Sequence, residues 1–166
     1  LVNVYPTGTI TKGREGAELA EMRDLKLAGA VAVSDDGSDV RDRGLLYKAM
    51  EYAQTHDILV MAHGENLSVD DGGSMHEGKI STRLGLAGIS DLTEDLAVRA
   101  NIMIAERTGA RLHMAHLSTK DAVLALKESK AQGYKNITGE VAVQHFALTD
   151  EECLGYNANA KMYPPL

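Results

Sequence analysis

The chain has 166 residues, and its 17 basic and 24 acidic side chains give a formal net charge of −7. Hydrophobic residues make up 44% of it, which is typical of a folded globular protein and excludes an intrinsically disordered one. The acidic balance argues against a nucleic-acid binder, and the lack of a long apolar run argues against a membrane span. A single cysteine excludes a disulfide scaffold and fits a reducing compartment, so we expect a cytoplasmic protein.

Short apolar runs alternate with stretches of helix-forming residues. In chain order the pattern predicts a strand at 2–5, a helix at 15–27, a strand at 30–33, a helix at 45–54, a strand at 58–62, a helix at 93–108, a strand at 111–117, a helix at 121–132 and a strand at 137–143. This alternation indicates an α/β fold with a parallel sheet, because the runs are continuous, as in strands buried on both faces. Segment 64–91 is too long for a simple connection and predicts a functional loop.

Helix boundaries carry their own signals. Thr93, and either Ser118 or Thr119, are expected to cap the starts of the third and fourth helices. Gly109 and Gly133 are expected to end those helices.

Side chains that can bind a metal or move a proton follow the predicted strands. They are Asp35 and Asp36, then His63 and Glu65, then His116 and Ser118, and finally Glu140 and His145. The carboxyl ends of parallel strands meet at one edge of a sheet, and a carboxylate with two imidazoles converging there suits a divalent ion such as zinc. Taken one at a time, the same residues also fit a turn with a helix cap and buried structural histidines. It is their joint position at successive strand ends that favours a metal site.

The remaining histidines are weaker candidates. His113 alternates within its strand and is expected to point away from the strand ends, towards the helices, with no role. His76, in the long loop, is expected to support the site or lie on the surface. His145 fits a ligand or a packing role equally well.

Several motifs, taken in order, resemble the middle of the dihydroorotases of the longer type, in the amidohydrolase superfamily. The matching pieces are Asn3-Val4-Tyr5-Pro6-Thr7-Gly8, Ala30-Val31-Ala32-Val33-Ser34-Asp35-Asp36-Gly37, Met61-Ala62-His63-Gly64-Glu65-Asn66, His76-Glu77-Gly78, His116-Leu117-Ser118-Thr119-Lys120, Thr138-Gly139-Glu140-Val141 and Lys161-Met162-Tyr163-Pro164-Pro165-Leu166. Together they cover essentially the whole chain.

This resemblance implies part of a (β/α)8 TIM barrel, with about five βα units that correspond roughly to strands 3–7 of the family's barrel. It implies one or two zinc ions and the interconversion of N-carbamoyl-L-aspartate and (S)-dihydroorotate in pyrimidine biosynthesis. By position, Asp36 resembles the carboxylate that bridges the metals, and His63 and His116 resemble two histidine ligands. Related dihydropyrimidinases and allantoinases place a carboxylated lysine on the strand that ends at Asp36. No lysine lies between Ala30 and Gly37, which favours the dihydroorotase interpretation over a hydantoinase or allantoinase type.

Other residues of the family's site do not occur in this sequence. The His-x-His pair, the substrate-binding arginine and asparagine that follow it, and the aspartate that moves the proton belong to strands that these residues do not include, the last beyond Leu166. We therefore expect residues 1–166 to be a partial barrel domain, truncated at both ends and inactive alone. A catalytically silent homologue that partners aspartate carbamoyltransferase is the alternative, and a homo-oligomer is also compatible.

Three positions depart from the family's motifs. Gly64 stands where a cysteine is usual, and Gln144 replaces the first histidine of a Pro-His-His segment. Tyr163 replaces an asparagine that contacts the substrate, so Tyr163 is the candidate substrate-binding residue and leaves the identity of the substrate open.

Overall fold

A five-stranded parallel sheet organises the chain. The computed structural model describes residues 2–69 and 72–166. The strands of this sheet are β1 (Thr7–Gly8), β2 (Ala32–Ser34), β3 (Leu59–Ala62), β6 (Arg111–Met114) and β7 (Ile137–Gly139). Their order is β1-β2-β3-β6-β7, and every neighbouring pair is parallel. The sheet therefore runs in chain order, as in part of a (β/α)8 barrel.

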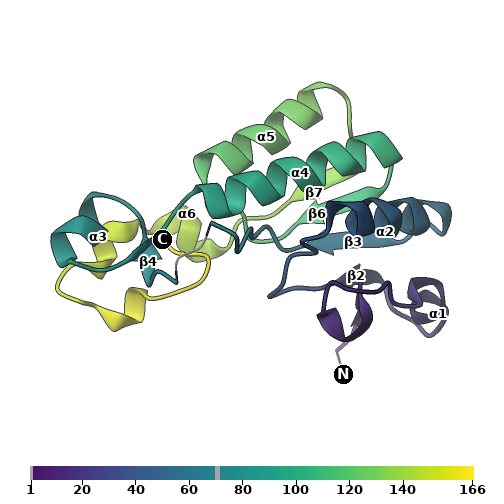
Figure 1. Cartoon of the computed structure of the whole chain (residues 1–166), viewed down its shortest axis with the longest axis horizontal. Coiled ribbons are helices and arrows are strands. Elements are labelled where there is room, and N and C mark those ends of the chain that lie inside the picture. Colours follow the sequence, from purple (N-terminus) through teal and green to yellow (C-terminus); the bar gives the residue numbers. More distant parts are fainter. Residues whose placement is uncertain (1, 70–71) are drawn as a thin grey trace.

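Helices cover one face of the sheet. The elements between and after the strands are η1 (Lys12–Arg14), α1 (Met22–Leu27), α2 (Arg43–Thr55), α3 (Lys79–Leu84), α4 (Leu92–Thr108), α5 (Lys120–Ala131) and α6 (Val143–Ala147). Helices α2, α4 and α5 lie side by side over the sheet (Figure 1). Val60, Leu112 and Met114 point into this layer and are fully buried, because alternate residues of a strand face the same side.

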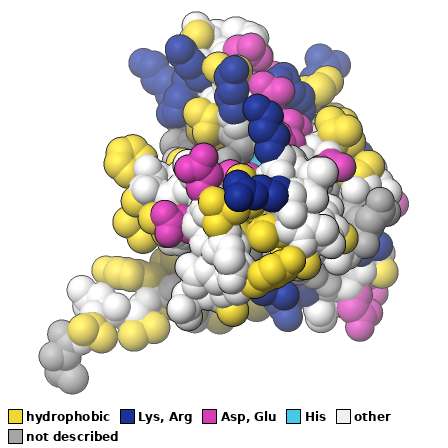
Figure 2. All heavy atoms as spheres, turned by 90° about the vertical axis from the view of Figure 1, so that its left-hand side faces the viewer, with side chains coloured by type: hydrophobic (Ala, Val, Ile, Leu, Met, Phe, Trp, Pro, Cys, Tyr) yellow, Lys and Arg dark blue, Asp and Glu magenta, His cyan; other side chains and the backbone are white. Residues whose placement is uncertain are grey.

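An insertion after β3 forms a second small unit. Strands β4 (Met75–His76) and β5 (Gly88–Ile89) pair in parallel, with α3 between them in the chain. The segment after α6 packs against this unit, with 3-10 turns η2 (Asp150–Cys153) and η3 (Ala158–Ala160) (Figure 1). Segment 64–91 thus contains ordered elements of its own. Figure 2 shows this side of the molecule, with exposed hydrophobic side chains at several places on it.

The predicted elements before β2 are wrong in their bounds. Residues 2–5 form no strand and are exposed, because the pairing partner of β2 is Thr7–Gly8. The predicted helix 15–27 is helical only from Met22, because residues 18–20 pair with 10–12 instead: Ala20 N donates to Ile10 O, and Lys12 N donates to Glu18 O.

The later elements follow the prediction more closely. Thr119 caps α5 by accepting a hydrogen bond from Ala122 N, and Gly109 ends α4 with a positive φ, as expected. Thr93 is not a cap: α4 begins one residue earlier, and the Thr93 hydroxyl is buried without a hydrogen-bond partner among the described residues. The strands predicted at 111–117 and 137–143 end earlier, at Met114 and Gly139. Within residues 2–69 and 72–166, no helix combines the length and apolar character that a membrane crossing requires.

Candidate metal centre

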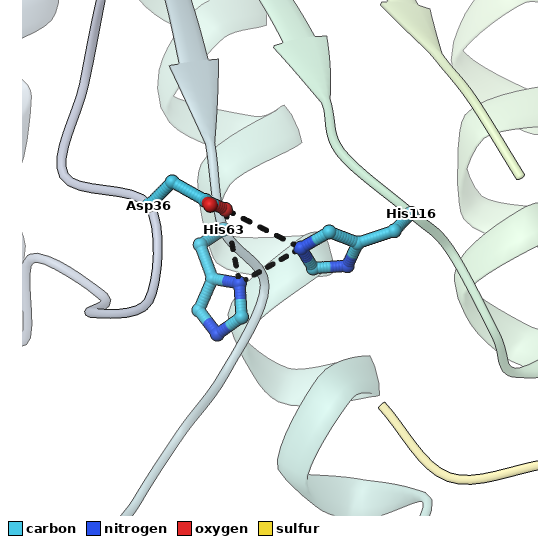
Figure 3. A group of neighbouring side chains, drawn as sticks. All are labelled: Asp36, His63 and His116. Atoms are coloured by element: carbon cyan, nitrogen blue, oxygen red, sulfur yellow. Dashed lines mark hydrogen bonds and ion pairs between the residues drawn. The ribbon is translucent and has the colours of Figure 1, made fainter. Parts of the chain in front are cut away.

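Three of the predicted residues meet at the carboxyl ends of neighbouring strands. Asp36 follows β2, His63 follows β3 and His116 follows β6, and their side chains point toward one another (Figure 3). His63 Nδ1 lies 3.0 Å from His116 Nε2 and 3.5 Å from Asp36 Oδ1, and His116 Nε2 lies 3.4 Å from Asp36 Oδ1. The three predicted residues therefore lie together, and their role as metal ligands stays a prediction.

The spacing of these three atoms fits a single metal ion. Two ligand atoms, each about 2.0–2.1 Å from a tetrahedral zinc ion, lie about 3.3 Å apart. The three observed separations of 3.0, 3.4 and 3.5 Å bracket this value. One carboxylate and two imidazoles form a donor set that zinc accepts, and three protein ligands leave further coordination positions open. The residues present therefore fit a divalent metal without rearrangement.

A buried carboxylate fixes the loop that carries Asp36. Asp35 has only 2% of its surface exposed, and its Oδ1 accepts hydrogen bonds from Ile10 N at 2.9 Å and Thr11 N at 3.1 Å. The Thr11 hydroxyl also donates to Asp35. Arg14 Nη1 donates to the Asp36 carbonyl at 2.8 Å. The carboxylate of Asp35 is thus hydrogen-bonded to the backbone of Ile10 and Thr11. The side chain of Asp36, which is 65% exposed, is the one that faces the histidines.

A second buried carboxylate orients His63. Glu65 Oε2 lies 3.0 Å from His63 Nε2, and the two side chains are 8% and 6% exposed. A carboxylate only accepts hydrogen bonds at neutral pH, so His63 carries its proton on Nε2 and directs the Nδ1 lone pair to the centre. The hydroxyl of Tyr163 donates to the other oxygen, Oε1. The expectation that Tyr163 contacts the substrate stays a prediction.

A third buried carboxylate holds the loop after His116. Glu94, in the first turn of α4, accepts hydrogen bonds from Ser118 N at 2.8 Å and from Thr119 N at 3.2 Å, and also from the Ser118 hydroxyl. His116 itself has a φ of +36°, a conformation that is unfavourable for a side chain with Cβ. The contacts of Glu94 therefore stabilise the strained loop that carries His116.

The sequence pattern missed these supporting roles. Asp35 was indistinguishable from a turn residue, and Glu94 from an ordinary acidic residue at its own helix start, because the donors of both lie 24 or 25 residues away in the chain. Of the three carboxylates, only Glu65 had a position that indicated a supporting role, because it lies two residues after the candidate ligand His63.

A cavity of about 330 Å³ adjoins His63. It lies between the insertion, the starts of α4 and α5, and the segment after α6. Its polar lining includes His63, Glu65, His76, Asp91, Lys120, His145, Asp150 and Tyr163. Asp36 and His116 do not line it, so the cavity lies beside the metal-facing atoms rather than over them.

The other histidines occupy different places. The expectation that His113 faces the helices is wrong. His113 lies on the opposite face of the sheet from Leu112 and Met114, which face the helices. Its Nδ1 lies 2.8 Å from Thr138 Oγ1, and its Nε2 lies 3.5 Å from Glu140 Oε2. His76 Nδ1 lies 3.1 Å from Asp91 Oδ1 at the cavity.

His145 is a structural contact rather than a member of the three-residue group. Its Nε2 donates to the carbonyl of Pro164 at 2.9 Å. Its Nδ1 is buried and has no partner among the described residues.

A polar cluster of Asp39, Arg43 and Asn101 adjoins His63. Arg43 pairs with the carboxylate of Asp39 and donates from Nη1 to Asn101 Oδ1 at 3.2 Å. Burial raises the pKa of Asp39 although Arg43 lowers it, so the loss of water outweighs the ion pair. The cluster ties the loop after β2 to helices α2 and α4.

Comparison with known proteins gives a consistent result. Residues 1–122 match the family model described as dihydro-orotase-like. A dihydroorotase of Pelotomaculum thermopropionicum is 50% identical over 165 residues, which cover 99% of this chain and 38% of the relative. A dihydroorotase of Geobacter sulfurreducens is 49% identical over 166 residues, which cover 100% of this chain and 39% of the relative. The chain thus spans less than two fifths of the length of these relatives.

Solved structures with the same fold are more distant in sequence. An L-hydantoinase (dihydropyrimidinase) from Arthrobacter aurescens superposes with a TM-score of 0.74 at 20% identity, over 97% of this chain and 37% of the other. A D-hydantoinase (dihydropyrimidinase) from Thermus sp. gives a TM-score of 0.67 at 22% identity, over 98% of this chain and 37% of the other. The predicted fold class, part of a TIM barrel, is confirmed.

Proposed function

The chain belongs to the dihydro-orotase-like family, and on that basis we propose that it supplies part of the metal site of a dihydroorotase. The reaction is the interconversion of N-carbamoyl-L-aspartate and (S)-dihydroorotate in pyrimidine biosynthesis, with zinc, one or two ions, as the cofactor. The observation that supports this most directly is the triangle formed by Asp36, His63 and His116 at neighbouring strand ends.

Each of the three residues has a defined part in holding the ion. Asp36 offers a negatively charged oxygen, and the two histidines offer the neutral nitrogens Nδ1 of His63 and Nε2 of His116. Zinc, when bound, acidifies a water molecule and polarises the carbonyl of a cyclic amide. Glu65 accepts the Nε2 proton of His63, which keeps that ring in the ligating tautomer.

The complete site requires residues from outside this sequence. We propose that residues 1–166 form a partial barrel domain, and that the remaining strands of the barrel carry the other metal ligands and the aspartate that moves the proton. In this arrangement a small cyclic amide bound at the metal site would extend into the cavity beside His63. We expect the enzyme to act in the cytoplasm, as a homo-oligomer or together with aspartate carbamoyltransferase.

Two alternatives are less well supported. A catalytically silent homologue has no need to keep one carboxylate and two imidazoles at metal spacing. A hydantoinase or allantoinase type would need a lysine on the strand before Asp36, and β2 with its flanking residues has none.

The test uses the protein encoded by the whole gene. We expect His63→Ala and His116→Ala each to lose zinc, measured as metal per polypeptide, together with hydrolysis of dihydroorotate. His56→Ala is the matched control, because His56 lies at the end of α2 and contacts the ring of Tyr52 instead. Variants that keep both zinc and activity would refute the ligand assignment. Faster turnover of hydantoin or allantoin than of dihydroorotate would favour the related enzymes.

A further inference from the structure

The hydroxyl of Tyr163 reaches the metal site through one intermediate residue. We propose that Tyr163 is a positioning residue whose phenol acts through Glu65 to fix the ring of the metal ligand His63. This inference rests on the proposed function and deepens it. It differs from a substrate contact, which is the role of the asparagine that Tyr163 replaces in the resembled motif.

Three side chains form a continuous hydrogen-bonded series. The Tyr163 hydroxyl donates to Glu65 Oε1, and Glu65 Oε2 accepts from His63 Nε2 at 3.0 Å. The opposite nitrogen of the same ring, Nδ1, lies 3.0 Å from His116 Nε2. A change at either end of Glu65 is therefore transmitted to the direction of the His63 lone pair.

Burial explains why Glu65 needs two partners. Its side chain is 8% exposed, and a buried carboxylate is costly unless its oxygens accept hydrogen bonds. With one bond to each oxygen, from Tyr163 and from His63, the carboxylate is fixed in one orientation. Without the phenol, Oε1 loses a donor, and the carboxylate gains freedom to rotate and to turn the imidazole with it.

The segment that carries Tyr163 is anchored beside it. His145 donates from Nε2 to the carbonyl of Pro164, the next residue in the chain. The phenol is thereby held at a fixed place although it lies 98 residues from Glu65 in the sequence. Its single hydrogen already points to Glu65, so the hydroxyl has no second hydrogen to donate to a substrate. An amide such as asparagine would instead offer two donors.

Zinc affinity is the primary measurement, made by competition with a chelating dye on the protein encoded by the whole gene. Carboxylates that orient a metal-bound histidine contribute a factor of about 10–100 to metal affinity. We expect Glu65→Gln to weaken zinc binding within that range. Because Tyr163 acts one step further out, we expect Tyr163→Phe to weaken it about tenfold or less.

A matched control and a double variant make the test specific. Tyr156→Phe removes a hydroxyl that donates to the Leu84 carbonyl at 2.9 Å, away from the metal-facing atoms, and should leave zinc affinity unchanged. If Tyr163 acts through Glu65, the double variant should bind zinc as weakly as Glu65→Gln alone. Substitution with Co²⁺ gives a second readout, because its visible absorption spectrum should change in Tyr163→Phe and not in Tyr156→Phe.

The outcomes separate this inference from the proposed function. Unchanged zinc affinity and Co²⁺ spectrum in Tyr163→Phe, with a raised KM, would make Tyr163 a substrate contact and overturn the positioning role. Additive effects in the double variant would also overturn it, since Glu65 would then not be the intermediary. Failure of the proposed function appears elsewhere, as zinc binding that His63→Ala leaves intact.

Discussion

Replacing Asp35 and Asp36 with asparagine, one at a time, separates loop anchoring from metal binding. The two residues are neighbours of the same type, yet Asp35 is 2% exposed and the side chain of Asp36 is 65% exposed. We expect Asp35→Asn to destabilise the fold and Asp36→Asn to weaken metal binding. The pair thus serves as its own control for charge and size.

The expected magnitude follows from the hydrogen bonds of Asp35. Its carboxylate accepts from two buried backbone N–H groups, Ile10 N and Thr11 N, and from the Thr11 hydroxyl. Asparagine keeps one oxygen for the N–H groups but removes the charge, which costs about 1 kcal/mol for each of two charge-assisted bonds. We therefore expect Asp35→Asn to lower the free energy of unfolding by about 2 kcal/mol. Alanine would leave both N–H groups unpaired, at a cost of roughly 4 kcal/mol.

Urea unfolding of the chelator-stripped protein measures this difference. Under those conditions Asp36→Asn should change the free energy of unfolding by less than about 0.5 kcal/mol, as expected for an exposed side chain. Zinc at about a hundred times its dissociation constant should stabilise the wild type by about 2.7 kcal/mol, and Asp36→Asn should lose that increment. The reverse pattern, with zinc stabilisation lost in Asp35→Asn and retained in Asp36→Asn, would refute the assignment of the ligand.

Two further variants test the packing around the site. Burial raises the folded-state pKa of Asp39 above its ordinary value of 3.8, so the folded state holds the proton more tightly than the unfolded state. The contribution of Asp39 to the free energy of unfolding should therefore fall as the pH rises from about 4 through the raised pKa. Asp39→Asn should remove that fall in urea unfolding measured from pH 4 to pH 7, and a contribution that grows with pH would contradict the sign. A Cβ at Gly64 would lie 2.8 Å from Val98 Cγ2, so Gly64→Ala should cost about 1–2 kcal/mol of stability, and a second change, Val98→Ala, should recover part of that loss. Equal stability of Gly64→Ala and the wild type would contradict this, because it would show that α4, which carries Val98, moves aside without a loss of stability.

The sequence identifies elements best where one strong local signal defines them. The third and fourth helices were predicted nearly to the residue, because periodic apolar positions and end signals such as Thr119 and Gly109 agree. The run at 2–5 misled the prediction, because a strand needs a partner and hydrophobic residues alone do not supply one. Likewise, helix formers at 15–21 are overridden by the pairing of residues 18–20 with 10–12.

The candidate site shows the same difference between local signals and contacts formed only on folding. That Asp36, His63 and His116 lie together was predictable, because a parallel sheet places the residues after its strands along one edge. The roles of Asp35 and Glu94 were not, because each depends on donors brought near by folding. The orientation of His113 was also missed, since which face of a strand meets the helices depends on register and not on composition.

Three supporting carboxylates connect the fold to the proposed metal site. Asp35 precedes Asp36, Glu65 follows His63, and Glu94 holds the loop after His116, and all three carboxylates are buried. Burial of a charge costs free energy, so each carboxylate is stable only when its donors are in place. The donors of Asp35 and Glu94 come from distant parts of the chain, and so does Tyr163, the donor to Glu65. Formation of the sheet and convergence of Asp36, His63 and His116 are therefore coupled.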